Sequence, residues 1–278
     1  MPANSEPRAP SPPGTPGGEG WGEGGRNPAR DIGPSNGILT PSPPTPLPRI
    51  TGGEGRTSII IPTWNEAPII ADTISNLRRL NPLEILIVDG GSTDATLHEA
   101  TAADRVLAAP PGRASQMNAG AKSARGDILV FLHADCRLTD DALLAAQRAL
   151  KRPDISAACF SMRVDAEGWP FRCIDACASA RVRLTGIAYG DQGLAIRRRD
   201  FERLGGFPQL RFMEDVVFSN RLRREGRIVV LRPEIRVSPR RWEKVGLIRQ
   251  TLRNWTLTAL ALAGVSPDQL AQYYPRVR

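Results

Sequence analysis

The sequence lacks several features that mark common classes of protein. Its four cysteines form no CxxC pair and show no zinc-site spacing with the two histidines, which argues against a disulfide scaffold and a zinc fold. The longest uncharged apolar run, 254–267, has 14 residues, whereas a membrane-spanning helix needs about 20. No basic start precedes an apolar core at the N-terminus, so we expect no secretory signal and a cytoplasmic protein.

Glycine-rich phosphate loops are missing as well. A dinucleotide-binding fold has a glycine-rich turn directly after its first strand, where the backbone approaches a pyrophosphate, but here that turn reads Pro-Thr-Trp-Asn-Glu at 62–66. No Walker-type GxxxxGK loop occurs anywhere in the chain. Hydride transfer and P-loop hydrolysis are therefore disfavoured.

Sizeable apolar side chains are scarce in residues 1–56, which hold 13 of the 25 prolines and 12 of the 26 glycines. Ordering a backbone costs about 1–2 kcal/mol per residue, and this segment has little to bury in return. We therefore expect a disordered Pro/Gly-rich tail at 1–56 and a catalytic domain at 57–232. A helical extension at 233–278 would pack on that domain or on a membrane surface.

The net charge of +8 is unevenly distributed along the chain. Residues 181–278 carry 20 basic and 9 acidic groups, a net charge of +11. A positive region of this kind favours phosphates, nucleic acid or anionic lipid as partners. The alternative is that these basic residues, nearly all arginines, are spread over solvated surfaces and serve no single partner.

From residue 57 onward, short apolar runs alternate with helical patterns. Strands are expected at 58–61, 84–88, 105–107, 128–132, 155–164, 194–196 and 228–231. Helices are expected at 68–80, 94–103, 113–124, 140–150, 171–184, 200–204, 215–224 and 242–263. This alternation predicts an α/β fold, with a mostly parallel sheet that has right-handed crossovers and is flanked by helices.

Polar segments follow the first four predicted strands, at 62–66, 89–94, 111–113 and 133–136. Ligands of open parallel sheets bind at the carboxyl ends of the strands, so we expect these segments to share one site. Glu66 and Asp89 can accept hydrogen bonds from ribose hydroxyls and from the ring N–H of uracil or guanine. For Asp89, a turn or capping role is the alternative.

Two further sets of side chains can carry chemistry. A nucleotide diphosphate needs its charge neutralised by a divalent cation, by arginine or by both. His133 and Asp135 could bind such a cation, and an imidazole with a carboxylate suits Mn²⁺ better than Mg²⁺. His133 could instead be a core histidine. Glu214 and Asp215 stand at a predicted helix start, where only one of two neighbours can face a cleft and serve as general base. A helix-capping pair is the alternative.

Together, these motifs resemble family-2 glycosyltransferases of the GT-A type over about residues 57–232. The resemblance rests on SIIIPTWNE at 58–66, IVDGGSTD at 87–94, NAGAKSARGD at 118–127, FLHAD at 131–135, and the segments 193–207 and 213–226. It implies a GT-A nucleotide-diphospho-sugar transferase fold with C-terminal helices. The donor would be a nucleotide-diphosphate sugar, and UDP-sugars are favoured.

The resemblance also implies roles for individual residues. Pro62, Glu66 and Asp89 would contact the donor nucleotide, and Asp135 would ligate a divalent cation, Mn²⁺ or Mg²⁺. Asp215 would act as the general base of a single inverting displacement. We also expect Arg113 to bind the donor and Glu214 to belong with Asp215 to the catalytic residues.

The chain departs from the family pattern at two places. The DxD motif of the family is His133-Ala134-Asp135 here, so the first acid is missing and metal dependence is less certain. The QxxRW motif of processive members survives only as Arg241-Trp242, which argues against polymer synthesis.

The segment YGDQG at 189–193 resembles a bacterial subgroup, the arsenosugar-biosynthesis glycosyltransferases related to 4,4'-diaponeurosporenoate glycosyltransferase. It implies that Asp191 and Gln192, with Arg241 and Trp242, lie near the sugar or acceptor. A polar turn is the alternative for the first two.

The C-terminal segment 242–274 mixes basic and apolar residues, which favours peripheral binding to an anionic membrane and a small or lipid-like acceptor. Packing on the core is the alternative. Nucleic acid is not an expected partner of a transferase. The competing function is a basic nucleic-acid or anionic-membrane binding protein on a degenerate transferase scaffold.

Overall fold

The computed structural model of the chain describes residues 55–262, 265–266, 269–270 and 273. Within these residues, the side chains of 241, 247, 248, 255, 258, 259, 261 and 262 are not described. The predicted tail therefore lies almost entirely outside the described residues. Residues 49–278 form one compact unit, and the description below concerns this unit alone.

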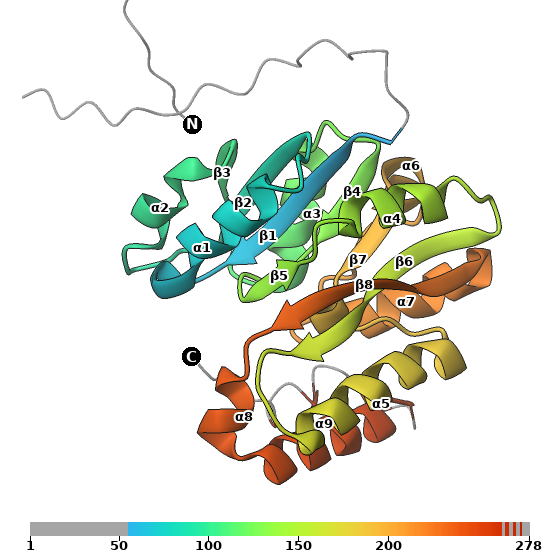
Figure 1. The fold of residues 1–278 in the computed structure, drawn as a ribbon. Coiled ribbons are helices and arrows are strands. Elements are labelled where there is room, and N and C mark those ends of the chain that lie inside the picture. Colours follow the sequence, from blue (N-terminus) through green and yellow to red (C-terminus); the bar gives the residue numbers. More distant parts are fainter. Residues whose placement is uncertain (1–54, 263–264, 267–268, 271–272, 274–278) are drawn as a thin grey trace, which may run out of the picture. The chain divides into compact units, whose positions relative to one another are not determined.

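The described residues form an eight-stranded sheet in the order β3-β2-β1-β4-β7-β6-β8-β5 (Figure 1). Its first half is parallel, because β1 pairs in parallel with β2 and with β4, and β2 pairs in parallel with β3. These strands are β1 (Thr57–Thr63), β2 (Glu84–Asp89), β3 (Arg105–Ala108) and β4 (Ile128–Phe131). All four match predicted strands, and the α/β fold class is confirmed.

The second half of the sheet departs from simple parallel pairing. β7 (Leu194–Arg197) is antiparallel to β4 and to β6 (Ile155–Val164), and β8 (Arg227–Val237) is parallel to β6. The short β5 (Cys136–Leu138), which was not predicted, pairs antiparallel with β8. β8 is longer than the predicted 228–231 because its register shifts past Pro233, where a bulge removes the need for a ladder N–H. It therefore continues across the boundary expected at 232/233.

Helices cover both faces of the sheet. Ile59 and Ile61 of β1 point toward the face packed by α1 and α4, whereas Ile60 points toward the face packed by α3, α6 and α7. This alternation follows from the two-residue period of a strand. The bounds are α1 (Ala67–Arg78), α3 (Arg113–Ser123), α4 (Ala142–Leu150), α6 (Arg198–Arg203) and α7 (Glu214–Glu225).

Two other helical stretches differ from their predictions. The predicted 94–103 helix is only α2 (Thr96–Glu99), followed by a short 3-10 turn at Ala100–Ala102. The predicted 242–263 helix is divided into α8 (Arg240–Val245) and α9 (Leu247–Leu262) by Gly246, whose φ of 90° an L residue rarely adopts. No helix in the described ranges is long and apolar enough to cross a membrane.

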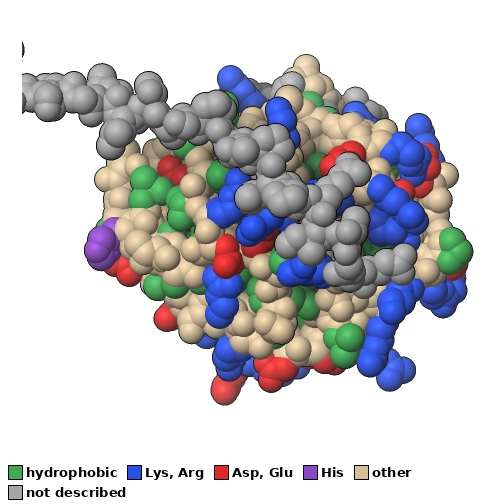
Figure 2. All heavy atoms as spheres, turned by 90° about the horizontal axis from the view of Figure 1, so that it is seen from above, with side chains coloured by type: hydrophobic (Ala, Val, Ile, Leu, Met, Phe, Trp, Pro, Cys, Tyr) green, Lys and Arg blue, Asp and Glu red, His purple; other side chains and the backbone are tan. Residues whose placement is uncertain are grey.

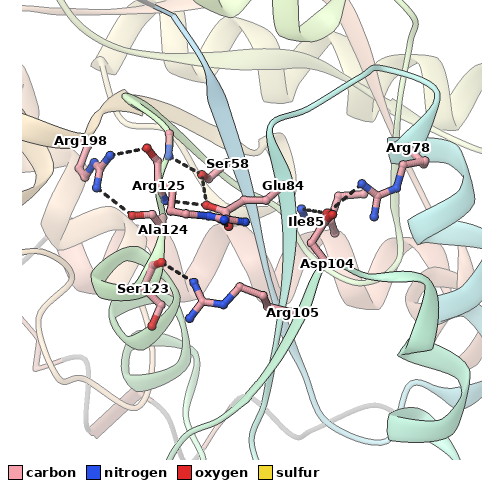
Figure 3. A network of polar contacts seen from close by, with 11 residues as sticks. Ser58, Arg78, Glu84, Ile85, Asp104, Arg105, Ser123, Ala124, Arg125 and Arg198 are labelled. Carbon is pink, nitrogen blue, oxygen red and sulfur yellow. Dashed lines mark hydrogen bonds and ion pairs between the residues drawn. The ribbon is translucent and has the colours of Figure 1, made fainter. Parts of the chain in front are cut away.

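The amino end of the sheet is held by a buried polar network around Glu84 (Figure 3). The Glu84 carboxylate is fully buried and accepts hydrogen bonds from the Ser58 hydroxyl at 2.7 Å and from the Arg125 backbone N–H at 2.6 Å. The Arg125 side chain pairs with it at 3.0 Å. Gly126 packs so closely that an added Cβ would lie 2.6 Å from the Ser58 nitrogen. β1, β2 and the approach to β4 are therefore tied together before the sheet begins.

Basic side chains are spread over the face shown in Figure 2, and acidic side chains lie among them. Several arginines of the C-terminal half form ion pairs, such as Arg203 with Glu225 at 2.7 Å and Arg227 with Asp154 at 3.8 Å. Exposed pairs of this kind contribute little stability. They do, however, neutralise part of the positive charge of the C-terminal half, as the solvated-surface alternative predicts.

Replacing Glu84 should destabilise the fold markedly. In Glu84→Ala the Ser58 hydroxyl and the Arg125 N–H lose their shared acceptor, so we expect a loss of about 3 kcal/mol in the free energy of unfolding. Urea unfolding followed by circular dichroism would measure it. Glu99→Ala, which removes an exposed carboxylate, is the control and should change stability by less than about 0.5 kcal/mol. Equal effects of the two substitutions would contradict a structural role for the network.

Candidate functional site

The carboxyl ends of β1 and β2 are joined by a buried glutamine. The Gln116 amide donates hydrogen bonds to the carbonyls of Thr63 and Val88, both at 2.7 Å. Gly90 lies against this amide, and an added Cβ there would be 3.0 Å from it. This contact holds the two strand ends at one level, which is where the sequence predicted a shared site.

The loops that follow β1 and β2 hold each other in place. Asp89 is 5% exposed, and its carboxylate accepts hydrogen bonds from the backbone N–H groups of Gly91 and Ser92, both at 2.9 Å. These are the contacts expected of a turn aspartate. Asn65, with a φ of 55°, accepts a hydrogen bond from the Thr93 N–H at 2.8 Å, and its own N–H donates to the Ser92 hydroxyl.

A cavity of about 120 Å³ lies beyond these loops, between the end of β4, α7 and the C-terminal helices. It brings together six of the side chains that the sequence singled out: Arg113, His133, Asp135, Asp191, Asp215 and Trp242. Pro62, Glu66 and Asp89 do not line it and stay at the ends of β1 and β2. These three predicted donor residues are thus separate from the predicted metal and base residues, whereas Arg113, also predicted to bind the donor, lines the cavity with them.

Asp215 is held at the cavity wall by a backbone group. Its Oδ2 accepts a hydrogen bond from the Gly190 N–H at 2.6 Å, and its Oδ1 accepts one from the Val216 N–H at 2.8 Å. Gly190 begins the 3-10 turn η2 (Gly190–Gln192). A Cβ on Gly190 would lie 2.7 Å from His133 Nε2 and 3.1 Å from Asp215 Oδ2, so three chain segments meet here without room for a side chain.

Glu214 points away from solvent, unlike its neighbour Asp215. It is 2% exposed and is held by Arg113, with Nε to Oε1 at 2.8 Å and Nη2 to Oε2 at 3.3 Å. Burial raises the pKa of Glu214 above its ordinary value, and the Arg113 guanidinium opposes that rise. Met213 precedes it with a φ of 59°, a backbone conformation that non-glycine residues seldom adopt outside functional sites. The Arg113–Glu214 ion pair joins the start of α3 to the start of α7.

Asp135 lies near a cation that the sequence did not single out by itself. Arg240 of α8 reaches Glu66 Oε2 at 3.3 Å and Asp135 Oδ2 at 3.8 Å, and so joins the donor side to the cavity. No group of three or more His, Cys, Asp or Glu residues in the described part of the chain could hold a metal ion alone. His133 and Asp135, which both line the cavity, are of the residue types that ligate divalent cations.

The predicted acceptor residues are partly brought together. Asp191 and Trp242 line the cavity, whereas Gln192 is fully buried behind its wall. The side chain of Arg241 lies outside the described residues. α5 (Trp169–Thr185), which was predicted only as a helix, contributes Arg181 to the cavity wall.

Four residues with evident positions at the site were missed by sequence reasoning: Gln116, Arg181, Gly190 and Arg240. Gly190 stands in the YGDQG segment and Arg240 beside Arg241-Trp242, so the motifs gave a signal for both. Gln116 and Arg181 lie within ordinary amphipathic helices. Nothing in their spacing distinguishes them from surface residues.

Comparison with known proteins gives a family match. Residues 58–201, about half of the chain, match the family described as Glycosyl transferase family 2. No curated protein sequence matches the chain.

Solved structures with a similar fold include a mannosyltransferase from Pyrobaculum calidifontis in complex with GDP-Man and Mn²⁺ (26% identity, TM-score 0.50). That likeness covers 63% of this chain and 56% of the other. TarS residues 1–349 of S. aureus with UDP-GlcNAc is 19% identical with a TM-score of 0.53, covering 66% of this chain and 58% of that one. GalNAc-T7 with UDP, GalNAc and Mn²⁺ is 17% identical with a TM-score of 0.52, covering 66% and 44%. This chain thus spans roughly half of the length of these structures, and the last two likenesses concern the fold alone.

The Arg113–Glu214 pair should show a pH-dependent contribution to stability. In Arg113→Gln the buried carboxylate loses its cation, so its pKa in the folded state rises further above the ordinary value of 4.5. We expect a loss of about 3 kcal/mol at pH 7. The loss should shrink as the pH falls from 7 toward 4.5, because the raised pKa of this carboxyl means that it is protonated above 4.5, first in the folded variant and then in the folded wild type.

Urea unfolding at pH 7 and pH 4 would measure this difference. Arg78→Gln is the matched control, because Arg78 pairs with Asp104 at 2.8 Å on the exposed surface. It should cost less than about 1 kcal/mol at either pH. The same loss at both pH values in Arg113→Gln would mean that Glu214 does not depend on Arg113 for its charge.

Proposed function

This chain belongs to glycosyl transferase family 2, and we propose that it transfers a sugar from a nucleotide-diphosphate donor to a small or lipid-like acceptor. A UDP-sugar is the favoured donor, and the reacting group of the acceptor is a hydroxyl or a carboxyl. The observation that carries the proposal is the cavity that Asp215, His133 and Asp135 line together. The reaction is a single displacement that inverts the anomeric centre.

Asp215 is the general base in this proposal. The Gly190 N–H holds one carboxylate oxygen at 2.6 Å, so the group is oriented before the acceptor arrives. It takes the proton from the acceptor hydroxyl as that oxygen attacks the anomeric carbon. Glu214 cannot share the role, because it is buried and paired with Arg113. It acts instead by holding the start of α7, on which Asp215 stands.

The diphosphate needs positive charge as it leaves. A divalent cation, Mn²⁺ or Mg²⁺, would neutralise that charge when bound, and Asp135 with His133 would hold it. The Pyrobaculum mannosyltransferase and GalNAc-T7 both have Mn²⁺ in their complexes. Arg240 lies within 3.8 Å of Asp135, so this chain also has a cation of its own beside that carboxylate. Arg113 is less available, since Glu214 occupies its guanidinium.

The donor nucleotide would lie along the ends of β1 and β2. Pro62 leads into this loop, Glu66 faces Arg240, and Asp89 stiffens the loop through its own turn. The Asp89 carboxylate also accepts a hydrogen bond from the Ser92 hydroxyl, so beside the two backbone N–H groups about one of its four lone-pair positions is left for a ribose hydroxyl or a base N–H.

The acceptor would enter past Asp191 and Trp242. The similarity to arsenosugar and diaponeurosporenoate glycosyltransferases, and with it a carotenoid-like or arsenosugar acceptor, stays a prediction. So does peripheral attachment to an anionic membrane through the C-terminal helices. Leu257 of α9 is buried against Ile187 and Val216, so part of this helix packs on the core as the alternative predicts. The division into a 57–232 catalytic domain and a C-terminal extension is likewise a proposal.

The competing function is a binding protein for nucleic acid or anionic membranes on a transferase scaffold. A binding protein would not need an oriented Asp215 carboxylate, nor a second carboxylate, Asp135, in the same cavity. Turnover of a UDP-sugar separates the two functions directly.

Replacing the proposed base tests the mechanism. We expect Asp215→Asn to lower the release of UDP from UDP-glucose or UDP-GlcNAc by about 10²–10⁴, because the oriented proton acceptor is lost. The affinity for UDP, measured by calorimetry, should change by only a few-fold. Asp140→Asn, an exposed residue, is the control. A parallel loss of UDP affinity would place Asp215 in the donor site instead.

In this proposal Asp135 acts by binding a divalent cation. The proposal can be tested by removing the Asp135 side chain or the cation. In Asp135→Ala, we expect UDP to bind more weakly than to the wild type when Mn²⁺ is present, and equally well after EDTA treatment. The expected difference with Mn²⁺ is about tenfold or more. If Mn²⁺ does not affect UDP affinity in the wild type, His133 and Asp135 are not a metal site, and Arg240 is left to neutralise the diphosphate.

A further inference from the structure

Four buried polar atoms without hydrogen-bond partners belong to residues in the cavity wall or directly behind it. The atoms are Arg181 Nε, Gln192 Nε2, Trp242 Nε1 and Asp191 Oδ1. Buried polar atoms in folded proteins nearly always have a partner, so these exceptions call for an explanation. Three of the four are N–H donors. The wall therefore offers more donors than it has acceptors, and a ligand rich in oxygen lone pairs would satisfy it.

Arg181 is the positively charged residue among these four. Its guanidinium stacks on the Tyr189 ring at 3.6 Å from the ring centroid, and Nη2 donates one long hydrogen bond to Gln192 Oε1 at 3.3 Å. No carboxylate in the described residues forms an ion pair with it. The other arginines of the site differ, since Arg113 pairs with Glu214 and Arg240 with Glu66.

A half-buried guanidinium without a counter-ion is costly unless a ligand supplies the negative charge. We propose that Arg181, with the Trp242 N–H of the same cavity wall, binds an anionic group, a carboxylate or a phosphate, on the acceptor. The Tyr189 ring holds the guanidinium in a fixed plane, and a planar guanidinium matches both anions through two parallel hydrogen bonds. This inference rests on the proposed glycosyl transfer and narrows its acceptor to a small hydroxylated anion.

The position of Arg181 favours the acceptor over the donor. Arg181 stands on α5 and lines the cavity together with Trp242 and Asn254 of the C-terminal helices, whereas the proposed nucleotide contacts lie at the ends of β1 and β2. Tyr189, which stacks on Arg181, is followed directly by Gly190, whose N–H holds Asp215. An anion on Arg181 would therefore anchor a molecule that extends toward the base. Asp191 Oδ1, the unpartnered acceptor atom, can accept a hydrogen bond from a second hydroxyl on that molecule.

The test uses a pair of fluorinated probes that differ in charge but hardly in shape, 4-fluorobenzoate and 4-fluorobenzamide. Binding to the full-length protein is followed by ¹⁹F NMR, with saturating UDP and Mn²⁺ and without them. Methyl phosphate then competes with the benzoate, which distinguishes a preference for phosphate from one for carboxylate. The variants are Arg181→Gln, Arg181→Lys and, as the matched control, Arg183→Gln. Arg183 is exposed on the same helix and loses the same charge.

We expect the benzoate to bind the wild type at least tenfold more tightly than the benzamide, with or without UDP. Arg181→Gln should weaken benzoate binding by at least tenfold, Arg181→Lys by less, and Arg183→Gln by under twofold. Circular dichroism and the affinity for UDP should stay unchanged in all variants, which excludes loss of the fold as the cause. Rescue of binding by lysine would mark the charge as the decisive property.

Several outcomes would overturn the proposal. Equal binding of the two probes, no binding of the benzoate at 20 mM, or no effect of Arg181→Gln would show that there is no anion site at Arg181. Displacement of the benzoate by UDP would assign Arg181 to the donor diphosphate. If UDP itself fails to bind while the benzoate still depends on Arg181, the proposed transferase function fails and the anion site remains without an acceptor role.

Discussion

The parallel pairing of β1 with β2 on one side and with β4 on the other is the constraint on which the site depends. The three central isoleucines of β1 are fully buried, so the strand has neighbours on both edges and helices on both faces. A slip of one residue would turn its side chains to the opposite faces of the sheet, which fixes the register. Because the strands end at the same level, the loops after them meet. Gln116 then joins two of these ends through their last carbonyls.

The two ends of the sheet treat polar groups in opposite ways. At the amino end the fully buried Glu84 has each of its contacts filled by Ser58 and Arg125, and Gly126 closes the remaining space. At the carboxyl end, N–H groups of Arg181 and Trp242 are buried without partners. A satisfied network adds rigidity, whereas unsatisfied donors cost stability and are retained where a ligand completes them. The satisfied and the unsatisfied buried polar groups described here thus lie at different ends of one sheet.

The helices after β8 belong to the site as well as to the surface of the domain. Arg240 of α8 reaches Glu66 and Asp135, and Trp242 lines the cavity. Leu257 of α9 is buried in a cluster with Met213 and Val216 at the start of α7, which carries Asp215. Removing α8 and α9 would therefore disturb both the packing of the helix that carries Asp215 and the wall of the cavity. Any contact with a membrane would have to leave these inward-facing residues in place.

The sequence by itself determined the order of the elements, the fold class and the family motifs. Runs such as Ile59–Ile61 can only be buried strands in this context, and polar residues that follow parallel strands must gather at one edge. The sequence also identified Asp135 and Asp215, because they stand in ordered motifs at strand and helix ends.

Only the tertiary structure decided which side chains satisfy one another. The antiparallel β7 and the short β5 depend on pairing with strands far away in the chain, so no local pattern predicts them. Glu214 and Asp215 are neighbours with equal charge, yet one is buried against Arg113, 101 residues away, and the other faces the cavity. Arg181 stands in an ordinary helix, and its lack of a counter-ion is visible only once every surrounding residue is in place. Partners of this kind are set by distances between segments, and a linear sequence does not contain those distances.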